Sequence, residues 1–296
     1  MANLYVFHQG HNNDGYLWFS AFDGTHWSTD YAITNAEGAG SGMTAAPSAL
    51  AIGEYLFVFH QGYAVDGQLW STYTQDFFSW VLDTPVPHLG ISESPSAVLY
   101  NGSPYVFHQG GGNNGQLWYT FYDGTWEPDT QIQPLGMSGS PSAVNWAGGI
   151  AVFHQGAGNN GQLWWTYSDD GADWDKDKLV PVLALTDSPS AVVYNGLLYV
   201  FHQGGGNEGR LRYTVSSDGK NWSEDTPIQN VNMSGSPSAV VWDGGITVFH
   251  QGYADNGQLW YTYSPDGLQW GGDTLVQSAE RGKSVGITDS AAPLVF

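Results

Sequence analysis

The residues whose types and spacing could do chemistry recur six times along the chain. The tripeptide His-Gln-Gly begins at His8, His60, His108, His154, His202 and His250. A glycine follows each histidine by seven residues, and the residue before it is always polar: Asp14, Asp66, Asn114, Asn160, Glu208 and Asn256. Ten residues after each histidine comes Trp18, Trp70, Trp118, Trp164, Arg212 or Trp260. Five copies therefore combine a histidine, a carboxylate or amide, and an indole around one short loop.

This combination suits a sugar. The C–H faces of a sugar stack on an indole, and its hydroxyls exchange hydrogen bonds with Asn, Asp and His side chains. We therefore predict that the six histidines, the six polar loop residues and the five tryptophans bind carbohydrate. A second interpretation stays open, in which each histidine bonds to neighbouring backbone and the tryptophans fill space between sheets. The histidine alone favours this structural interpretation, whereas the loop side chain and the tryptophan together favour binding.

Metal, cofactor and catalytic chemistry are not expected. The six histidines belong to separate repeats, and no cluster supplies three or four ligands at short spacing. A glycosidase needs one unique pair of carboxylates, but most acids in the motifs recur between copies. The non-repeated acids Glu54, Glu93 and Asp187 have no evident partner. Nucleophile elbows, phosphate loops and nicotinamide fingerprints are absent from the sequence, so we predict that the protein is not an enzyme.

The spacing of the histidines predicts the elements that must position them. Successive histidines lie 52, 48, 46, 48 and 48 residues apart, which indicates a repeat architecture. One unit runs from Asp187 to Gln229, and its Asn195-Gly196 pair is a strong hairpin signal. Strands are predicted over 188–194, 197–203 and 210–216, with a weaker fourth strand from Trp222. Four antiparallel strands in under fifty residues make one blade of a β-propeller, whereas a β-solenoid has shorter repeats without this hairpin.

The two ends of the chain predict how the ring closes. The first His-Gln-Gly is preceded by a second strand but by no first strand, and the segment from Thr288 to Phe296 resembles an orphan first strand. When aligned on the unit that begins at Asp187, Phe296 falls on Tyr194 and Met1 follows without a gap. We therefore predict an all-β, six-bladed propeller of four-stranded antiparallel blades. The C-terminal strand completes the N-terminal blade and hides the sheet edges, and residues 1–296 form one domain.

Two further repeated motifs have predicted places in such a blade. Segments of the type Ser-Gly-Ser-Pro-Ser lead into each first strand and should share a rim with the histidine loops, where crevices between blades could hold a ligand. The motif Asp-Gly-x-x-Trp, as in Asp170 to Trp174, resembles the Asp box of sialidase-like propellers. We predict that it is a structural turn on the opposite face, in which Asp caps backbone donors and Gly takes a positive φ.

Composition narrows the class of partner. The net charge is −21 with only seven basic residues, so nucleic acid and anionic membrane surfaces would be repelled. Cysteine is absent, which excludes disulfides and thiolate metal sites. No apolar run is long enough to span a membrane, so we expect no membrane insertion. The N-terminus lacks the features of a signal peptide, and we expect a cytoplasmic protein or one released without such a peptide.

The repeat Val-Phe-His-Gln-Gly … Gly-Gln-Leu-Trp-Tyr, as in 106–119 and 248–261, resembles the repeats of small propeller lectins. The nearest are the six-bladed, N-acetylglucosamine-binding lectins of the Agrocybe mushroom type, and the seven-bladed Photorhabdus propeller lectins are more distant. This resemblance implies several equivalent, metal-independent sites for glycans with terminal non-reducing N-acetylglucosamine. Aleuria-type fucose lectins also have six blades, but their sites use a recurring arginine that this chain lacks.

The sequence leaves the ligand open, and two of the six copies depart from the shared motif. Two alternatives for the ligand stay open. The protein could bind another glycan, such as fucose, or it could be a scaffold that binds a protein partner. The fifth copy, with Glu208, Arg210 and Arg212, should be weak or silent if tryptophan stacking matters. The second copy, with Val65 and Ser71, should differ in affinity.

Overall fold

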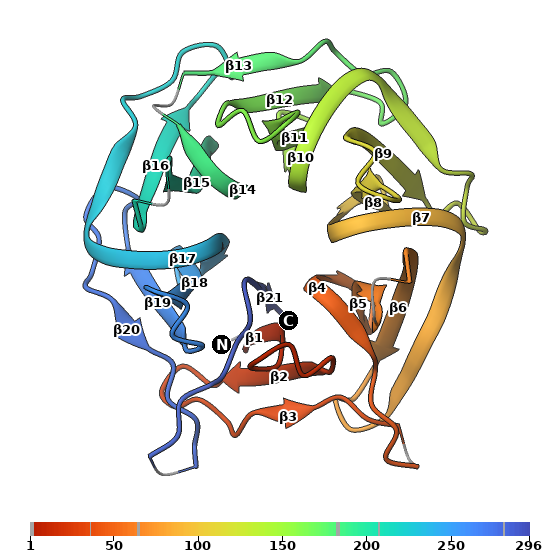
Figure 1. The fold of residues 1–296 in the computed structure, drawn as a ribbon, viewed down its shortest axis with the longest axis vertical. Helices are drawn as coiled ribbons and strands as arrows, with labels where there is room; N and C mark the ends of the chain where they lie inside the picture. The colour runs from red at the N-terminus through yellow and green to blue at the C-terminus, as the bar shows by residue number, and fades with distance from the viewer. Residues whose placement is uncertain (1–2, 36, 64–65, 182–183, 207, 281) are drawn as a thin grey trace.

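The computed structural model describes residues 3–35, 37–63, 66–181, 184–206, 208–280 and 282–296. Six antiparallel sheets stand around a central axis like the blades of a propeller (Figure 1), which confirms the predicted fold class. Blade 1 contains, from the axis outward, β21 (Ala291–Val295), β1 (Leu4–Gln9), β2 (Leu17–Phe22) and β3 (Tyr31–Ala32). We number the blades by the order of their His-Gln-Gly copies.

Three long strands each serve two blades, because they run from the outer edge of one into the inner edge of the next. They are β7 (Trp80–Tyr100), β10 (Thr130–Trp146) and β17 (Thr226–Trp242). Blade 2 contains β4 (Met43–Ile52), β5 (Tyr55–Gly62), β6 (Gln68–Thr74) and β7, and blade 3 contains β7, β8 (Ser103–Gly110), β9 (Gln116–Phe121) and β10. Blade 4 contains β10, β11 (Gly149–Gly156), β12 (Leu163–Ser168) and β13 (Lys178–Val180). Blade 5 contains β14 (Leu185–Tyr194), β15 (Leu197–Gly204), β16 (Arg210–Ser216) and β17, and blade 6 contains β17, β18 (Gly245–Gly252), β19 (Leu259–Ser264) and β20 (Thr274–Leu275).

The ring closes as the ends of the sequence predict. The C-terminal β21 pairs antiparallel with β1, in a register that joins Leu4 to Val295 and His8 to Ala291. Asn3 and Phe296 exchange two main-chain hydrogen bonds of 3.1 and 3.2 Å beyond the strand ends. The two termini consequently lie side by side near the axis (Figure 1). Blade 1 is thus built from both ends of the chain.

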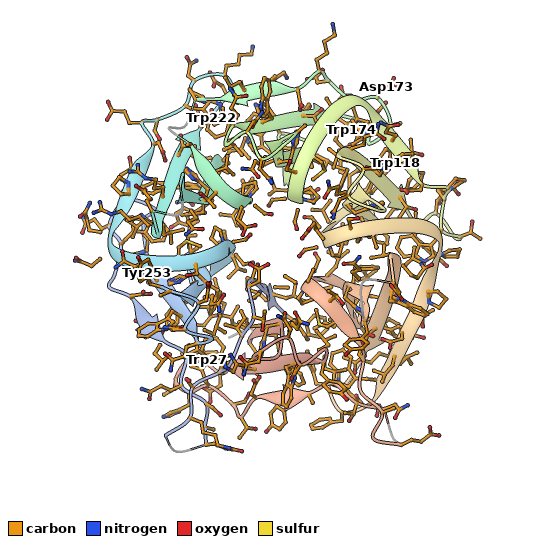
Figure 2. The ribbon with its side chains drawn as sticks, in the orientation of Figure 1. Trp27, Trp118, Asp173, Trp174, Trp222 and Tyr253 are labelled. Atoms are coloured by element: carbon orange, nitrogen blue, oxygen red, sulfur yellow. The ribbon has the colours of Figure 1, made fainter. Side chains whose placement is uncertain are left out.

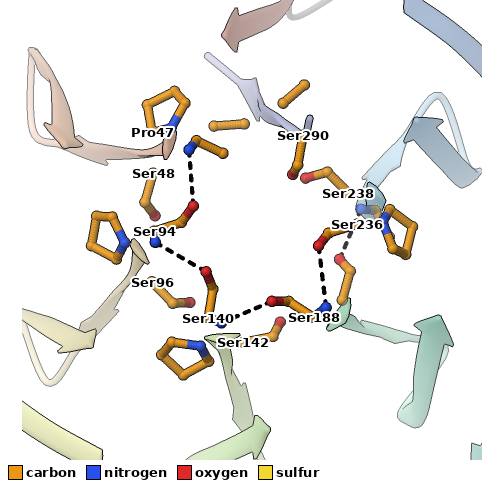
Figure 3. A pocket seen from close by; sticks show the side chains of 18 of the residues that line it. Pro47, Ser48, Ser94, Ser96, Ser140, Ser142, Ser188, Ser236, Ser238 and Ser290 are labelled. Carbon is orange, nitrogen blue, oxygen red and sulfur yellow. Dashed lines mark hydrogen bonds between the residues drawn. The ribbon is translucent and has the colours of Figure 1, made fainter. Parts of the chain in front are cut away.

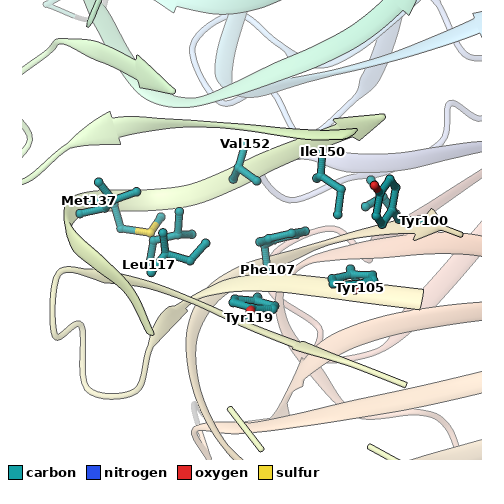
Figure 4. Close-up of a cluster of buried hydrophobic side chains, with 11 residues drawn as sticks. Tyr100, Tyr105, Phe107, Leu117, Tyr119, Met137, Ile150 and Val152 are labelled. Atoms are coloured by element: carbon teal, nitrogen blue, oxygen red, sulfur yellow. The ribbon is translucent and has the colours of Figure 1, made fainter. Parts of the chain in front are cut away.

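Aromatic pairs fill the interfaces between blades. The phenylalanine before each His-Gln-Gly is fully buried and meets, edge to face, the tryptophan of the Asp turn in the next blade. Ring centroids lie 5.4–6.3 Å apart with interplanar angles of 75–89° at all six interfaces. Figure 4 shows the cluster between blades 3 and 4, where Phe107 packs with Tyr105, Tyr119, Ile150 and Val152. Such aromatic pairs add about 0.5–1.5 kcal/mol each to the burial of their area.

The Asp turns have the predicted structural role. In the turn of blade 4, Asp170 Oδ1 accepts the N–H groups of Ala172 and Asp173 at 2.8 Å, and Gly171 has a φ of +80°. These backbone donors hold the pKa of the Asp170 carboxyl below its ordinary value. The tryptophan of the turn does more than cover the blade edge, because it inserts against the neighbouring blade, as the labels for Trp27, Trp174 and Trp222 in Figure 2 help to locate.

Serine hydroxyls join the inner strands around the central channel (Figure 3). The first serine of each Ser-Pro-Ser accepts a main-chain N–H from the preceding blade, as Ser140 does from Ser94 at 3.0 Å. In blades 3, 4 and 5 the second serine accepts the N–H of an alanine in the following blade, as Ser96 does from Ala143 at 2.9 Å. The Ser-Pro-Ser repeats thus link neighbouring blades by hydrogen bonds at the channel.

Candidate functional site

The motif histidines lie inside their blades, and none of their surface is exposed. Each Nδ1 lies 3.0–3.2 Å from the carbonyl oxygen of the following glutamine. Each Nε2 lies 2.9–3.4 Å from an aspartate at the start of the outer strand, namely Asp30, Asp83, Asp129, Asp177, Asp225 and Asp273. Both ring nitrogens are therefore engaged within the blade in this conformation. This arrangement favours the structural interpretation of the histidines.

Burial and charge oppose each other at these pairs. Burial pulls the pKa of His8 down, but the Asp30 carboxylate outweighs it, so the pKa of His8 is raised above its ordinary value. A buried imidazole in hydrogen-bond contact with a carboxylate is a rigid link between the second strand and the outer strand.

The glutamine of the motif joins one blade to the next. In four copies its Nε2 donates to a main-chain carbonyl on the inner strand of the following blade at 3.0–3.4 Å. The four donor–acceptor pairs are Gln9–Met43, Gln61–Ile91, Gln155–Leu185 and Gln203–Met233. The glutamines therefore hold blades together at the face that carries the His-Gln-Gly loops, which we call the loop face.

The polar loop residue and the tryptophan contact each other. Asp14 Oδ1 accepts the N–H of Tyr16 at 2.9 Å, and its Oδ2 accepts the indole N–H of Trp18 at 2.8 Å. Asp66 bonds in the same way to the N–H two residues on and to Trp70, at 2.8 and 3.0 Å. The carboxylate thus caps its own loop and fixes the indole. All five tryptophans keep part of their surface exposed.

The copies with asparagine satisfy one donor fewer. Asn114 Oδ1 accepts the N–H of Gln116 at 3.0 Å, so its amide nitrogen is left to face the indole N–H of Trp118. Both nitrogens lie above Gly110, where a Cβ would fall 2.3 and 2.6 Å from them. Among the described residues, the buried Nε1 atoms of Trp118 and Trp260 have no hydrogen-bond partner. Whichever way the amide is turned, one donor lacks an acceptor, because the side chain has a single oxygen.

The fifth copy replaces this pair with an ion pair. Arg212 Nε donates to Glu208 Oε1 at 2.5 Å, and Arg212 Nη1 donates to the carbonyl of Asp225 at 3.3 Å. The carboxylate again lies over the glycine of the motif, because a Cβ on Gly204 would fall on the Glu208 side chain. Glu208 therefore takes the place that Asp14 and Asp66 have over the motif glycine, and its partner is an arginine instead of a tryptophan. The weak or silent fifth site remains a prediction.

In four copies, the residue just before the predicted polar residue lines a surface hollow. Asn13, Asn113, Asn159 and Asp255 have left-handed backbones, with φ of 50–51°. Their N–H groups donate at 2.8–3.1 Å to hydroxyls of the segments that lead into the first strands, namely Thr288, Ser92, Ser138 and Ser234. These bonds confirm that the serine segments share a rim with the histidine loops. The predicted difference at Val65 lies outside the described residues, as does Asn207.

One hollow of about 360 Å³ lies on the loop face between blades 3 and 4. Glu93, Gln109 and Asn113 of blade 3 line one side, and Ser138 and Asn159 of blade 4 line the other. Carboxylate, amide and hydroxyl groups alternate around this wall, so it offers acceptors and donors at close range.

A larger hollow of about 630 Å³ repeats this arrangement between blades 5 and 6 and extends to blade 1. Asp187, Gln203, Ser234 and Asp255 take the places of Glu93, Gln109, Ser138 and Asn159. Tyr253 is 58% exposed at the rim and supplies an aromatic face. Blade 1 adds Asn13, Thr288 and Asp289.

The acids of both hollows occupy equivalent positions, which we call the bulge positions, within or just before the inner strands. Glu93, Asp187 and Asp289 have φ of 60–67° in blades 3, 5 and 1. The corresponding residues in blades 4, 6 and 2 are Gly139, Gly235 and Ala45, also with positive φ. An acidic blade therefore alternates with a blade that carries a small residue. The hollow walls consequently repeat every two blades, whereas the His-Gln-Gly motif repeats in every blade.

Two carboxylates of the larger hollow share one serine. Ser236 Oγ donates to Asp187 Oδ1 at 3.0 Å, and the Ser236 N–H donates to Asp289 Oδ1 at 3.4 Å. Burial, and next the Asp187 carboxylate, raise the pKa of Asp289 to about 7. Burial also raises the pKa of Glu93. The Asp289 carboxyl at the mouth of the channel therefore stays protonated to a higher pH than an ordinary aspartate does.

Within the described residues, no three His, Asp or Glu side chains gather in a way that could hold a metal ion. In the same part of the chain, no helix is long and apolar enough to cross a membrane.

Comparison with solved structures supports the β-propeller fold. The chain resembles the Aleuria aurantia lectin in complex with Fucα1-6GlcNAc, with a TM-score of 0.66, 13% identity and coverage of 95% of this chain and 94% of that one. It also resembles AofleA from Arthrobotrys oligospora, with a TM-score of 0.66, 14% identity and coverage of 95% and 83%. An α-L-arabinofuranosidase from Clostridium thermocellum matches with a TM-score of 0.53, 14% identity and coverage of 84% and 95%. At these identities the likeness shows the fold, which both lectins and a glycosidase use. No family model matches the chain, and no curated protein matches it.

The sequence prediction missed the residues that line the hollows. It chose Asn114 and Asn160, whereas the side chains that face the hollow are those of Asn113 and Asn159. A signal was present, because Asn and Asp tolerate the left-handed conformation, and each of the four left-handed residues is an Asn or Asp two residues before the fixed glycine.

Proposed function

We propose that this propeller is a multivalent, metal-independent lectin that binds terminal sugar residues in the hollows of its loop face. The observation that carries the proposal is the recurrence of one polar wall, an acid, a glutamine, a serine and a left-handed Asn or Asp, at blades 3–4 and again at blades 5–6. Such a wall matches the dense hydroxyls of a sugar, and Tyr253 offers a face for its C–H groups. Several sites on one rigid disc raise avidity for clustered glycans by about 10²–10⁴.

N-acetylglucosamine is the sugar that we propose. Its acetamido N–H can donate to Glu93 or Asp187, and its carbonyl can accept from an amide or a hydroxyl of the same wall. The resemblance of the repeats to N-acetylglucosamine-binding lectins supports this choice. Fucose is the alternative, supported by the propeller lectins of similar fold that were solved with fucosides. The five predicted tryptophans, which lie in the strands that follow these loops, remain candidate contacts.

A glycosidase is the second candidate function, and one observation favours it. Asp187 and Asp289 flank Ser236, and a carboxyl with a raised pKa beside a second carboxylate is the arrangement that glycosidases use for acid catalysis. The bulge acids recur in three blades, however, whereas a catalytic pair is needed once. We therefore propose binding without catalysis. Release of nitrophenol from a panel of nitrophenyl glycosides between pH 5 and 8 would support the enzyme instead.

Calorimetric titration with N-acetylglucosamine and with fucose tests the lectin proposal. Substitution Asn159→Ala should remove one site from the fitted stoichiometry and leave the affinity of the others unchanged. The matched control is Asn160→Ala, one residue along, which should lower the melting temperature but keep the number of sites. If Asn160→Ala removes the site and Asn159→Ala does not, the binding surface is the originally predicted loop and not the hollow. A flat titration with both sugars and silence on a glycan array would reject the lectin.

A further inference from the structure

A pocket of about 280 Å³ opens between blades 6 and 1, at the end of the blades opposite the loop face. Phe22 and Trp27 of blade 1 and Trp242, Thr247 and Tyr261 of blade 6 are among its walls. Gly24 of the Asp turn and Asp243 of the first hairpin also line it, which places it on the side of the Asp turns. This is the junction where the two ends of the chain complete the ring.

The pocket exists because blade 6 carries a small residue at a position that is aromatic in four of the six repeats. In blades 3 and 5, Tyr105 and Tyr199 cover the glycine of the next Asp turn, so closely that a Cβ on Gly171 or Gly267 would fall 2.7 or 2.4 Å from the ring hydroxyl. Thr247 stands at this position in blade 6. The strand registers show the equivalence, since Tyr105, Tyr199 and Thr247 each lie three residues before the motif histidine and pair with the third strand.

Blade 4 also has a small residue there, but the space is filled in another way. Ala151 replaces the tyrosine, and the rings of Trp165 and Trp146 cover Gly219 of the next turn, at 2.6 and 3.2 Å from a Cβ position. In blade 6 the residue equivalent to Trp165 is Tyr261, a smaller ring. Thr247 and Tyr261 together thus leave room for a ring that the chain itself does not supply.

The pocket wall contains a buried hydroxyl that has nothing to bond. Thr247 is 2% exposed, and among the described residues its Oγ1 has no hydrogen-bond partner. Leaving such a group unsatisfied costs about 1–3 kcal/mol, so a native protein usually gives it a partner. A ligand atom in the pocket would be that partner.

Apart from Thr247, Leu4, Gly24 and Asp243, the residues that line the pocket carry aromatic rings. The Phe22 ring lies 5.0 Å from Trp27 and 5.3 Å from Trp242, and Trp27 lies 6.3 Å from Tyr261. An apolar cavity of about 150 Å³ is enough to bind benzene, so this larger volume has room for one or two fused rings. A pyranose would leave most of its hydroxyls without partners here, which separates this pocket from the polar hollows of the loop face.

We propose that this pocket binds a small aromatic molecule that carries one hydrogen-bonding group, of the phenol or indole class. Its ring lies among Phe22, Trp27, Trp242 and Tyr261, and its hydroxyl or N–H bonds to Thr247 Oγ1. A wider groove of about 780 Å³ adjoins the pocket on the outer side and shares Phe22, Trp27 and Tyr261 as walls, which gives the ligand a way in. This site lies at the seam of blades 6 and 1, and none of its lining residues lines the polar hollows of the loop face.

The test uses indole and phenol as probes, titrated into the full chain by calorimetry. Wild type should bind each probe at one site. Substitution Thr247→Tyr, which places there the residue of blades 3 and 5, should reduce affinity at least tenfold and leave the sugar titration unchanged. Tyr261→Trp, the residue of blade 4, is a second filling variant. Thr247→Val keeps the volume and removes the hydroxyl, so it should weaken phenol about five- to tenfold and leave toluene unaffected.

Two results would overturn the proposal. One is the failure of wild type to bind either probe at millimolar concentration. The other is undiminished binding by the two filling variants, which would place the probes elsewhere. Equal losses of phenol and toluene in Thr247→Val would refute the hydrogen bond to Oγ1. If the wild type binds indole or phenol but no sugar, the lectin proposal is rejected and the proposal for this pocket is retained.

Discussion

The exchange of Asn114 for aspartate tests whether the polar loop residue serves the fold. In the wild type the buried Nε1 of Trp118 lacks an acceptor among the described residues, whereas Asp14 and Asp66 accept the equivalent indole N–H at 2.8 and 3.0 Å. Asn114→Asp should supply that acceptor. A hydrogen bond to a charged group contributes about 1.5–3 kcal/mol, and exposure of the loop to solvent reduces the gain to about 1 kcal/mol. For a chain of this length, such a gain raises the melting temperature by about 2 °C.

Two further exchanges at equivalent positions in other blades test the same effect on stability. Asn256→Asp should give a similar gain beside Trp260, and the two gains should add because blades 3 and 6 are far apart. Asp66→Asn is the reverse exchange and should lower the melting temperature by a comparable amount. Thermal unfolding followed by tryptophan fluorescence measures the shifts, and calorimetry with the sugar counts the sites. A lower melting temperature for Asn114→Asp, or loss of a sugar site without a change in stability, would refute the structural role.

Three further predictions concern packing and pH. Gly156→Ala should lower the free energy of unfolding by about 1–3 kcal/mol in urea titration, because a Cβ there falls 2.5 Å from the amide nitrogen of Asn160. Phe107→Ala should cost about 3–5 kcal/mol in the same assay, since it removes the ring that packs against Trp174. The raised pKa of Asp289 means that the fold favours its neutral form, so wild-type stability should fall as pH rises from about 4 to about 7 and then level off. Asp289→Asn should flatten that part of the curve of melting temperature against pH.

The fold could be predicted because the same pattern of strands and turns occurs six times in the sequence. Spacing, hairpin signals such as Asn195-Gly196, and the half-blade at each end together determine the number of blades and the closure. The register between β1 and β21 agrees with the alignment of Phe296 on Tyr194, since Leu4 pairs with Val295 as Leu198 pairs with Val193. Errors in any single strand are corrected by the other copies.

The site could be predicted only in part, because sequence spacing gives offsets along the chain but not the direction of a side chain. Asn114 and Asn113 are neighbours, yet one folds back over Gly110 and the other lines a hollow. The difference lies in the left-handed backbone of Asn113 and in the bond from its N–H to Ser92. This hydrogen bond joins residues that are 21 positions apart in the sequence. It could not be predicted from the spacing counted from the motif histidine.

Two periods coexist in this ring, and they separate what holds it together from what faces the hollows. The features that recur in every blade, namely the buried phenylalanine, the histidine–aspartate pair and the glycine under the loop, all make contacts inside or between blades. The features that recur in every second blade are the bulge residues, acidic at Glu93, Asp187 and Asp289 and small at Ala45, Gly139 and Gly235. A structural contact must be made at each of six interfaces, so its period is one blade. A ligand wall needs an acid on one side and space on the other, so its period is two, and the six-bladed ring is accordingly expected to present three such walls.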